Sequence, residues 1–461
     1  MRKDIPTVAP DEWLGEAPCC ETPLRLRPAR PAADHVPEMM IYQIWLRSFT
    51  PEGTLRAAKD RLEYVAELGA NTVYLSPISK HSEDARPQYL SPRTSQSSAG
   101  HVKNPYRISD YDTVEPEYGT EEDLRAFIAE AHRLGLRVLM DLVYFHSSAD
   151  SVLLKDPEFH VRDENGEPVL GDWNFPVLNF ESANLRRCMI GNMLHWVRDC
   201  GADGFRCDVS YGVPSSFWEE ARYALEAVKP DIVMLAESEV PQEQLKAFDL
   251  SYNFSYYLVL YDVMRKGHPA TRLREQWEIK RSKFPAGARH AYFCDNHDKD
   301  RVDVVFGYRG AEVVAALMFA LDGIPFVYNG QEIADATPDD VMSRETIRWD
   351  LADEPSRRER TAFFRDLFAV RRRERVLTHG VLKWMANSAP DAVLTFTRED
   401  GARKLLVAVN LSNRNEIVDL DCRLSEETPL LERRWSRMSA PGGSCERLCL
   451  RAYGFLVAAI D

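Results

Sequence analysis

Apolar stretches alternate with amphipathic stretches along most of the chain, starting near residue 40. Short runs rich in Val, Ile and Leu occur at 41–47, 71–77, 136–145, 203–209, 231–237, 291–296 and 324–330. Segments with helical periodicity lie between them, among them 54–69, 120–135, 184–201, 215–229 and 310–321. Because buried parallel strands read as continuous apolar runs, the pattern predicts a parallel sheet of about eight strand–helix units. That number favours a closed (β/α)₈ TIM barrel over an open sheet.

The pattern changes in four other places. Beyond about residue 377, short alternating strands such as RKLLVAVNLS predict a C-terminal antiparallel β-sandwich over 377–461, after a barrel over 38–376. An irregular stretch at about 147–183 forms an insert after the third strand of the barrel. Residues 1–37 are rich in Pro and Arg, and we expect a loose N-terminal extension there. The polar stretch from 78 to about 112 is predicted to be a long loop.

The composition is that of a globular protein, with 28% charged and 44% hydrophobic residues in a chain of 461. The net charge of −14 argues against a nucleic-acid partner, because such affinity needs clustered Lys and Arg. No apolar run reaches the ~18 residues of a membrane span, and the N-terminus lacks a signal-peptide core. The odd number of cysteines, nine, favours reduced thiols. We therefore expect a cytoplasmic protein without a membrane partner; nothing here indicates its oligomeric state.

Polar residues follow several of the predicted strands, at the end where the active site of such a barrel lies. These residues are Asp141 and His146 after the third strand, Arg206 and Asp208 at the fourth, Glu237 at the fifth, and Asn296, His297 and Asp298 after the seventh. Structural ion pairs explain one or two such residues, but not so many at the same end of so many strands. We therefore predict an active site at this end of the barrel.

Two carboxylates in different surroundings suit glycoside hydrolysis. Arg206 would keep Asp208 ionised, as a nucleophile requires, whereas Glu237 lies in the apolar context MLAES without an adjacent cation. The pKa of Glu237 would then be raised, as a general acid requires. A separation of ~5 Å between the two groups would retain the anomeric configuration. The competing chemistry is a divalent metal held by the histidines and carboxylates, but the His-x-His pair usual after the first strand of metal-dependent barrels is absent.

Several motifs resemble the α-amylase superfamily, glycoside hydrolase family 13. GFRCDV resembles its nucleophile motif, MLAESE its acid/base motif, DNHDKDR its third-carboxylate motif and DLVYFH the motif after strand three. IYQIWLRSFTPEGT, NPYRISDYDTVEPEYGT and IPFVYNGQEI are similar to further family landmarks, in the same order, over about residues 40 to 375.

The resemblance implies a role for each site residue. Asp208 would be the nucleophile, Glu237 the acid/base, and Asp298 would bind sugar hydroxyls. Arg206 would orient the nucleophile, and Asp141 and Asn296 would be supporting residues, with Asp141 holding Arg206. His146 and His297 would donate hydrogen bonds to the sugar, and Tyr106 would be a stacking platform. A sugar's C–H face packs well on an aromatic ring, so the role of Tyr106 is physically sensible.

The chain also departs from the family's pattern. Phe145 stands where the family usually has the Asn that ligates a structural calcium. We therefore expect no required cofactor and assign no metal ligand, and a structural calcium is left open. Tyr211 and Gly212 replace the Lys-His pair of many endo-acting amylases, and Arg107 replaces the Asp of many exo-acting glucosidases.

The resemblance implies a retaining α-glycoside hydrolase that acts on α-glucan oligosaccharides through a covalent glycosyl-enzyme. One alternative is a transglycosylase or isomerase of α-glucosides that uses the same intermediate. The other is a non-catalytic, sugar-binding relative; such relatives typically lose a carboxylate, and all three remain in this chain. Linkage, chain length and endo or exo action are left open.

Overall fold

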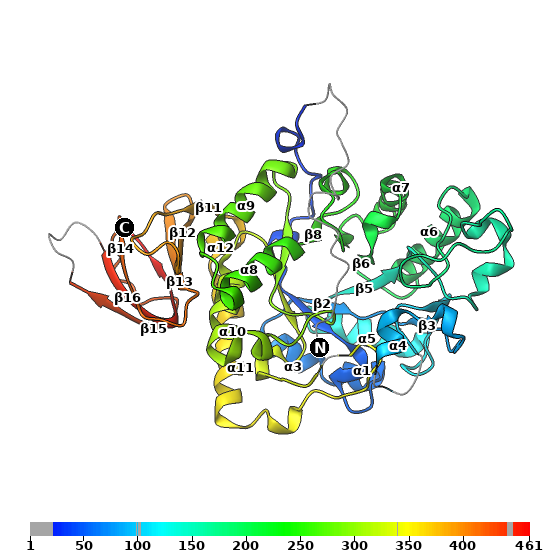
Figure 1. Cartoon of the computed structure of the whole chain (residues 1–461), viewed down its shortest axis with the longest axis horizontal. Helices are drawn as coiled ribbons and strands as arrows, with labels where there is room; N and C mark the ends of the chain where they lie inside the picture. The colour runs from blue at the N-terminus through cyan, green and yellow to red at the C-terminus, as the bar shows by residue number, and fades with distance from the viewer. Residues whose placement is uncertain (1–21, 98, 100–102, 339, 440–445) are drawn as a thin grey trace.

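Eight parallel strands close a barrel at the centre of the molecule, with helices around it and an antiparallel sheet at one side (Figure 1). The structure is a computed structural model that describes residues 22–97, 99, 103–338, 340–439 and 446–461. The barrel strands are β1 (Ile41–Ile44), β2 (Thr72–Leu75), β5 (Arg137–Val143), β6 (Gly204–Asp208), β7 (Val233–Ala236), β8 (Leu250–Tyr252), β9 (His290–Phe293) and β10 (Ile324–Tyr328). They follow one another around the barrel in chain order, and β10 returns to β1. The predicted (β/α)₈ barrel is confirmed.

Seven of the eight strands lie at the predicted apolar runs. The exception is β8, whose three residues are too few to form a recognisable run. The first run is a strand only as far as Ile44, because the short helix α1 (Leu46–Phe49) begins two residues later. The predicted loop at 78–112 contains a hairpin of β3 (Ser79–His81) and β4 (Ile108–Val114), with a short helix, α4 (Pro92–Gln96), between these two strands.

The helices cover the outside of the barrel. They are α2 (Leu55–Lys59), α3 (Leu62–Leu68), α5 (Glu121–Arg133), α6 (Ala183–Arg198), α7 (Ser215–Glu226), α8 (Phe254–Lys266), α9 (Thr271–Lys283), α10 (Val302–Ala320), α11 (Pro355–Arg373) and α12 (Arg375–His379). The stretch 54–69, predicted as one helix, forms the two helices α2 and α3. The start of α5 carries a capping box in which Thr120 and Asp123 each accept a hydrogen bond from the other's backbone N–H.

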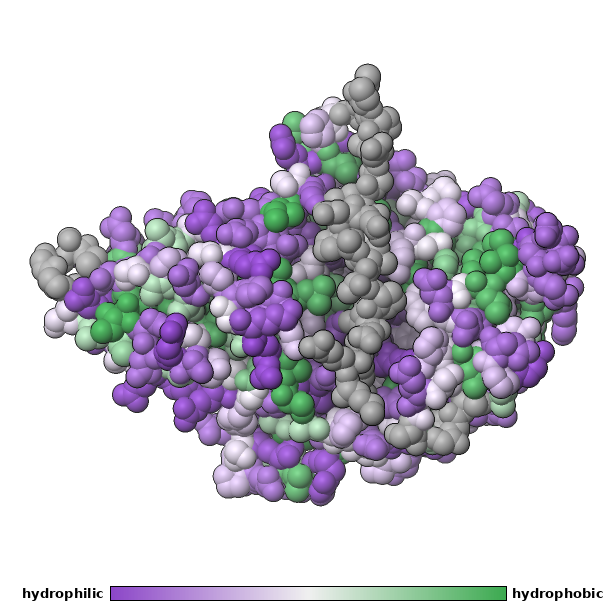
Figure 2. Space-filling view, in the orientation of Figure 1, coloured by the Kyte–Doolittle hydropathy of each residue, from purple (hydrophilic) through white to green (hydrophobic). Residues whose placement is uncertain are grey.

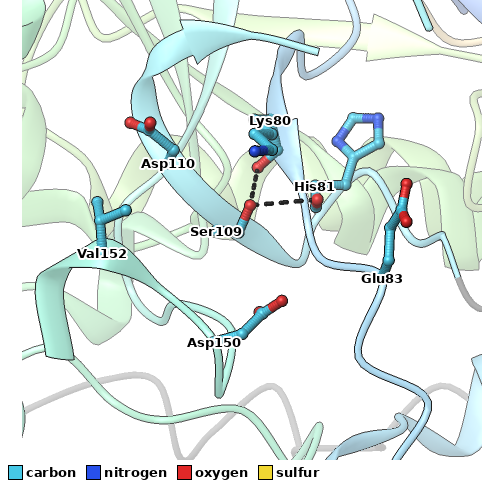
Figure 3. Close-up of a pocket in the computed structure, with 7 residues that line it drawn as sticks. All are labelled: Lys80, His81, Glu83, Ser109, Asp110, Asp150 and Val152. Atoms are coloured by element: carbon cyan, nitrogen blue, oxygen red, sulfur yellow. Dashed lines mark hydrogen bonds between the residues drawn. The ribbon is translucent and has the colours of Figure 1, made fainter. Parts of the chain in front are cut away.

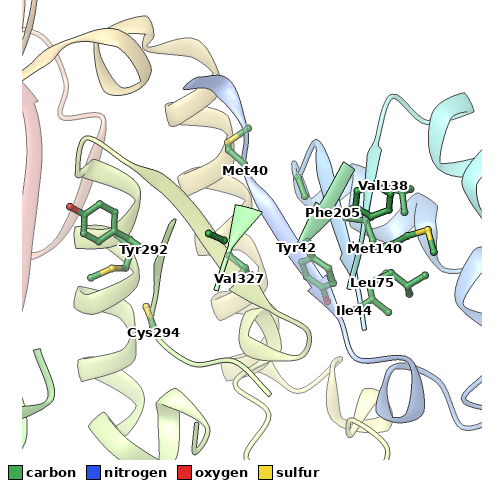
Figure 4. Packing of buried hydrophobic residues seen from close by; sticks show 14 of the residues in the cluster. Met40, Tyr42, Ile44, Leu75, Val138, Met140, Phe205, Tyr292, Cys294 and Val327 are labelled. Carbon is green, nitrogen blue, oxygen red and sulfur yellow. The ribbon is translucent and has the colours of Figure 1, made fainter. Parts of the chain in front are cut away.

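Alternate side chains of the strands build two apolar layers. Ile41, Leu139 and Phe293 point into the barrel and pack against one another there. Their neighbours Tyr42 and Met140 point outward and pack under the helices, as Figure 4 shows. Both faces of the sheet are therefore buried, which is why the strands read as continuous apolar runs.

The described part of the predicted N-terminal extension, residues 22–37, packs against the amino end of the barrel and is not a loose arm. Arg30 forms ion pairs with Asp249, directly before β8, and with Glu226 at 2.6 Å. Val36 is fully buried in the layer inside the barrel. This segment includes the 3₁₀ turns η1 (Leu24–Leu26) and η2 (Val36–Glu38). The rest of the extension lies outside the described residues.

An antiparallel sheet domain follows the barrel where the β-sandwich was predicted, and its six strands pair in a single sheet. Its strands are β11 (Val381–Trp384), β12 (Val393–Asp400), β13 (Arg403–Asn410), β14 (Glu416–Leu420), β15 (Leu431–Met438) and β16 (Glu446–Ala459). The order is β11-β12-β13-β16-β14, and β15 also pairs with the long β16. Helices α10 and α11 lie between this sheet and the barrel (Figure 1). Arg398 of β12 is buried there and donates to the carbonyl oxygens of Ala320 and Leu321, at 2.8 and 2.7 Å.

The surface in Figure 2 is mostly hydrophilic, with small separate hydrophobic patches. No helix within the described ranges is long and apolar enough to cross a membrane. Six cysteines of the described residues are free thiols, and Cys19, Cys20 and Cys445 lie outside those ranges.

Candidate active site

Three carboxylates meet one guanidinium at the carboxyl ends of β5, β6 and β7. Arg206 of β6 donates through Nη1 to Asp141 Oδ1 and to Asp208 Oδ1, both at 2.8 Å. Its Nη2 lies 2.7 Å from Glu237 Oε1, directly after β7. Neighbouring parallel strands bring these side chains together, because their carboxyl ends lie at the same edge of the barrel.

The cluster is shielded from water, which makes its electrostatics strong. The side chain of Arg206 is 1% exposed and that of Asp141 is fully buried. Burial alone would lower the pKa of Arg206, but Asp141 and Glu237 raise it well above its ordinary value. The cation is therefore permanent, and each carboxylate depends on it for charge compensation.

The structure corrects the surroundings predicted for Glu237. We expected no adjacent cation, and this is wrong, because Arg206 reaches it from the neighbouring strand. Glu237 Oε2 also accepts the backbone N–H of Val209 at 2.9 Å, so both carboxyl oxygens are hydrogen-bonded. Local sequence around Glu237 could not reveal a partner that lies 31 positions earlier along the chain.

Both candidate catalytic carboxyls have raised pKa values. Burial raises the pKa of Asp208 well above its ordinary value, Arg206 opposes the shift, and the charges of Glu237 and Asp141 add to it. Burial also raises the pKa of Glu237, again opposed by Arg206 and supported by the charge of Asp298. The cation that was expected to hold Asp208 ionised is shared by three carboxylates, so burial outweighs its effect.

The residues after β9 form a second group at the same edge. Gln43 Nε2 donates to His297 Nδ1 at 2.8 Å, which leaves the ring proton on Nε2, 3.0 Å from Asp298 Oδ2. The ring of Trp45 stacks on His297 with centroids 4.9 Å apart. Asn296 Oδ1 accepts the backbone N–H of Asp298 at 2.9 Å and so fixes the turn that presents this carboxylate.

Tyr106 joins the two groups. Its hydroxyl lies 3.0 Å from Asp141 Oδ2 and 2.6 Å from His297 Nε2. Its partly exposed ring stacks with Trp45, with centroids 6.2 Å apart. The structure therefore places this predicted platform between the carboxylate cluster and the residues after β9.

His146 lies at the same end of the barrel, but its donor is already used. Its Nε2 lies 2.9 Å from the carbonyl oxygen of Tyr106, which can only accept, so Nε2 carries the proton. Burial lowers the pKa of His146 to about 4, which keeps the ring neutral at pH 7. The remaining Nδ1 is then an acceptor, buried without a partner among the described residues. In this arrangement His146 does not offer the donor that was expected of it.

Arg93 is a site residue that sequence reasoning missed. It lies on α4, and its Nη1 donates to Asp298 Oδ1 at 2.6 Å while Nη2 donates to the carbonyl oxygen of His297 at 3.0 Å. These contacts keep Asp298 ionised. Burial alone would raise the pKa of Asp298, but His297 and Arg93 lower it well below its ordinary value. No motif marks Arg93, because it belongs to the polar stretch between the second and third barrel strands.

Phe145 and Gly212, two residues that depart from the family's pattern, lie in contact with each other. A Cβ on Gly212 would lie 2.6 Å from the ring of Phe145, so that ring occupies the space beside Gly212. The same ring meets Trp173 edge-on, with centroids 6.1 Å apart. Calcium needs oxygen ligands, and this apolar contact supplies none where the resemblance places an Asn. The residues present do not fit that calcium site.

Arg107 does not take part in the cluster. It is fully buried and donates to Ser82 Oγ at 2.6 Å. Near the β3–β4 hairpin lies a cavity of about 270 Å³, lined by Lys80, His81, Glu83, Ser109, Asp110, Asp150 and Val152 (Figure 3). It shares no lining residue with the carboxylate cluster.

One group of possible metal ligands occurs among the described residues. Glu121, His195 and Cys200 place one ligand atom each within 4.8 Å of one another, between the start of α5 and the end of α6. Arg125 donates to Glu121 in the same group, so a cation is already present there. The group lies on the helix layer and includes none of the predicted site residues.

Comparison with known proteins identifies the family. The sequence model described as "Alpha amylase, catalytic domain" matches residues 27–164 and 170–367. Alpha-amylase MalA of Haloarcula japonica is 26% identical over 404 residues, which cover 83% of this chain and 57% of that enzyme. The cyclomaltodextrinase of Geobacillus thermopakistaniensis is 25% identical over 440 residues, covering 89% of this chain and 70% of that enzyme. This chain therefore spans only part of the length of these relatives.

A solved structure agrees with the sequence matches. The noncanonic maltogenic alpha-amylase AmyB from Thermotoga neapolitana superposes with a TM-score of 0.80 at 25% identity, over 93% of this chain and 100% of that one. The matched region contains the whole barrel and every residue of the carboxylate cluster. The chain belongs to the α-amylase family of glycoside hydrolases.

Proposed function

We propose that the protein is a retaining hydrolase of α-glucan oligosaccharides, with Asp208 as nucleophile and Glu237 as acid/base. The observation that carries this proposal is the pair of carboxyl groups bonded to the two terminal nitrogens of one guanidinium. Groups held so close together favour the ~5 Å separation of retaining enzymes over the ~6.5–9.5 Å that leaves room for a water in inverting ones.

The reaction proceeds in two displacements. A carboxylate oxygen of Asp208 attacks the anomeric carbon, and the glycosidic C–O bond breaks as Glu237 gives its proton to the leaving oxygen. A water then attacks the same carbon, loses its proton to Glu237 and releases Asp208. Glu237 is the more accessible of the two, with a side chain 16% exposed against 8% for Asp208, as suits the residue that meets leaving group and water.

The surrounding residues bind and hold the sugar in this account. Asp298 is ionised and partly exposed, so it accepts hydrogen bonds from sugar hydroxyls. Tyr106 presents its ring beside the cluster as a stacking surface. Arg206 and Asp141 orient Asp208. The relatives named alpha-amylase and cyclomaltodextrinase support α-glucans as the substrate class.

The test is a panel of maltose, isomaltose, trehalose, sucrose, maltoheptaose and pullulan, with products separated by chromatography and anomers followed by NMR. We expect release of the α-anomer first, and loss of turnover in Asp208→Asn. Release of the β-anomer first would contradict retention. Binding without turnover on every sugar would instead favour the non-catalytic alternative.

We also propose that activity needs no calcium at the position of Phe145. The support is the apolar contact of that ring with Trp173 and its position over Gly212. Dialysis against EGTA should change neither turnover nor the thermal midpoint, and restored activity on adding calcium back would contradict this.

A further inference from the structure

Arg93 lies in a polar stretch of the chain, and hydrogen bonds hold the turn that presents it. The Ser91 side chain accepts the backbone N–H of Thr94 at 3.1 Å, which caps the start of α4. Asn104 Nδ2 donates to Thr94 Oγ1 at 3.3 Å, and Asn104 Oδ1 accepts the backbone N–H of Tyr106 at 3.0 Å. The turn that presents Arg93 is therefore tied to the residue that presents the aromatic ring.

The guanidinium of Arg93 lies at the open side of the site. Its side chain is 34% exposed and that of Asp298 is 29% exposed, so both reach the solvent at the mouth of the barrel. Two of its nitrogens are committed to Asp298 Oδ1 and to the His297 carbonyl oxygen. The other oxygen of Asp298 faces His297 Nε2 at 3.0 Å. Any hydroxyl that binds Asp298 must therefore fit beside Arg93.

A sugar hydroxyl can donate one hydrogen bond and can also accept hydrogen bonds, so hydroxyls match an adjacent carboxylate and guanidinium. Asp298 alone can only accept, whereas Arg93 can only donate. Side by side, they can bind two neighbouring hydroxyls, one donating to the carboxylate and one accepting from the guanidinium. Both hydrogen bonds are charge-assisted and so are stronger than neutral ones.

We infer that Arg93 is a specificity-determining residue that binds, together with Asp298, a pair of neighbouring hydroxyls on the sugar ring whose bond is cleaved. The inference rests on the proposed function and adds to it a residue outside every motif of the resemblance. It also assigns a role to α4, a helix of five residues in a polar stretch.

The experiment compares α-glucosyl fluoride with its 2-, 3-, 4- and 6-deoxy analogues and measures fluoride release. This substrate carries only the ring that is cleaved, so contacts beyond it do not contribute. Arg93→Met should lower kcat/KM on the parent compound by about 10- to 100-fold, the scale of one or two charge-assisted hydrogen bonds. The loss should shrink to about 3-fold or less on the analogues that lack the hydroxyls it binds. The kcat/KM of Arg93→Lys should lie between that of the wild type and that of Arg93→Met.

The matched control is Arg86→Met. Arg86 lies in the same polar stretch, is 53% exposed and pairs with Asp84 rather than with a site residue. This variant should stay within about 2-fold of the wild type on all five compounds. An equal loss in Arg93→Met on every analogue, or a loss no larger than that of the control, would overturn the inference.

A binding measurement separates this inference from the proposed function. Maltose binding is measured by calorimetry in Asp208→Asn, which cannot turn over, with and without Arg93→Met. Weaker maltose binding caused by Arg93→Met, but not by Arg86→Met, supports the contact between Arg93 and the sugar. This holds even if the wild type releases no fluoride, because the absence of fluoride release counts only against the proposed hydrolysis. Unchanged binding together with unchanged turnover would refute the role of Arg93.

Discussion

At the scale of single residues, Arg206 determines the chemistry of the site. It compensates Asp141, Asp208 and Glu237 at once, while burial raises the pKa of Asp208 and that of Glu237. The protonation of Asp208 and that of Glu237 therefore depend on each other. Their protons belong to a coupled pair, which is the arrangement that lets one group stay ionised while the other keeps its proton.

This coupling predicts the pH dependence of kcat/KM. Activity needs one proton on the pair, with Asp208 ionised and Glu237 protonated. It therefore appears as pH rises through the lower pKa of the pair and disappears as pH rises through the higher one, and burial raises the pKa of each group above the ordinary 3.8 of Asp and 4.5 of Glu. We expect a bell-shaped profile with both limbs displaced upward, measured from pH 4 to 9. Full activity maintained down to pH 4 would contradict the raised pKa values of this pair.

At the scale of elements, the barrel strands were predictable because both faces of a parallel sheet are buried and produce apolar runs. Asp208, Glu237 and Asp298 were predictable because they lie at or just after the carboxyl ends of such runs. β8 was missed because three residues produce no run, and Arg93 was missed because a polar turn on α4 has no periodicity. The Arg206–Glu237 contact was missed because it forms across two strands, which local sequence does not report.

The first residue of β6 gives a prediction at this scale. A Cβ on Gly204 would lie 2.1 Å from the backbone oxygen of Val233 on β7, which cannot move without breaking the pairing of these strands. Gly204→Ala should therefore cost about 1–3 kcal/mol of stability and also reduce kcat/KM, because β6 carries Arg206 and Asp208.

Gly191 of α6 provides the control for that variant. It is exposed and has nothing within 4 Å of an added Cβ, so Gly191→Ala should raise stability by about 0.5–1 kcal/mol without changing activity. Thermal unfolding and kinetics on both variants make the comparison. Equal stability and equal kcat/KM in Gly204→Ala and Gly191→Ala would show that the close approach of β6 and β7 does not constrain the site.

At the scale of the whole molecule, the barrel and the C-terminal sheet are joined by buried polar contacts as well as by apolar packing. Arg398 is fully buried and donates to Ala320, Leu321 and Gly380, and burial lowers its pKa to about 10. Arg434 forms an ion pair with Glu312 of α10 at 2.7 Å. The sheet thus covers the outer face of α10, a helix whose other face packs on the barrel.

Removal of this buried link should destabilise the molecule. Arg398→Met removes the donor from the carbonyl oxygens of Ala320 and Gly380, and it leaves that of Leu321 with Arg371 alone. We expect the thermal midpoint to fall by about 4 °C or more. Arg375→Met serves as the comparison, because Arg375 is 65% exposed and pairs with Asp400 at the surface. A midpoint for Arg398→Met no lower than that of Arg375→Met would contradict the structural role of the link.

The central claim of this account is a covalent bond between the sugar and Asp208. The most direct measurement is mass spectrometry of the protein after incubation with 5-fluoro-α-glucosyl fluoride, whose ring fluorine slows both displacements while the anomeric fluoride still leaves readily. We predict one fluoroglucosyl unit per chain, on the peptide that contains Asp208, and none in Asp208→Asn. An unlabelled protein that still hydrolyses α-glucans, or a label on another residue, would contradict the claim.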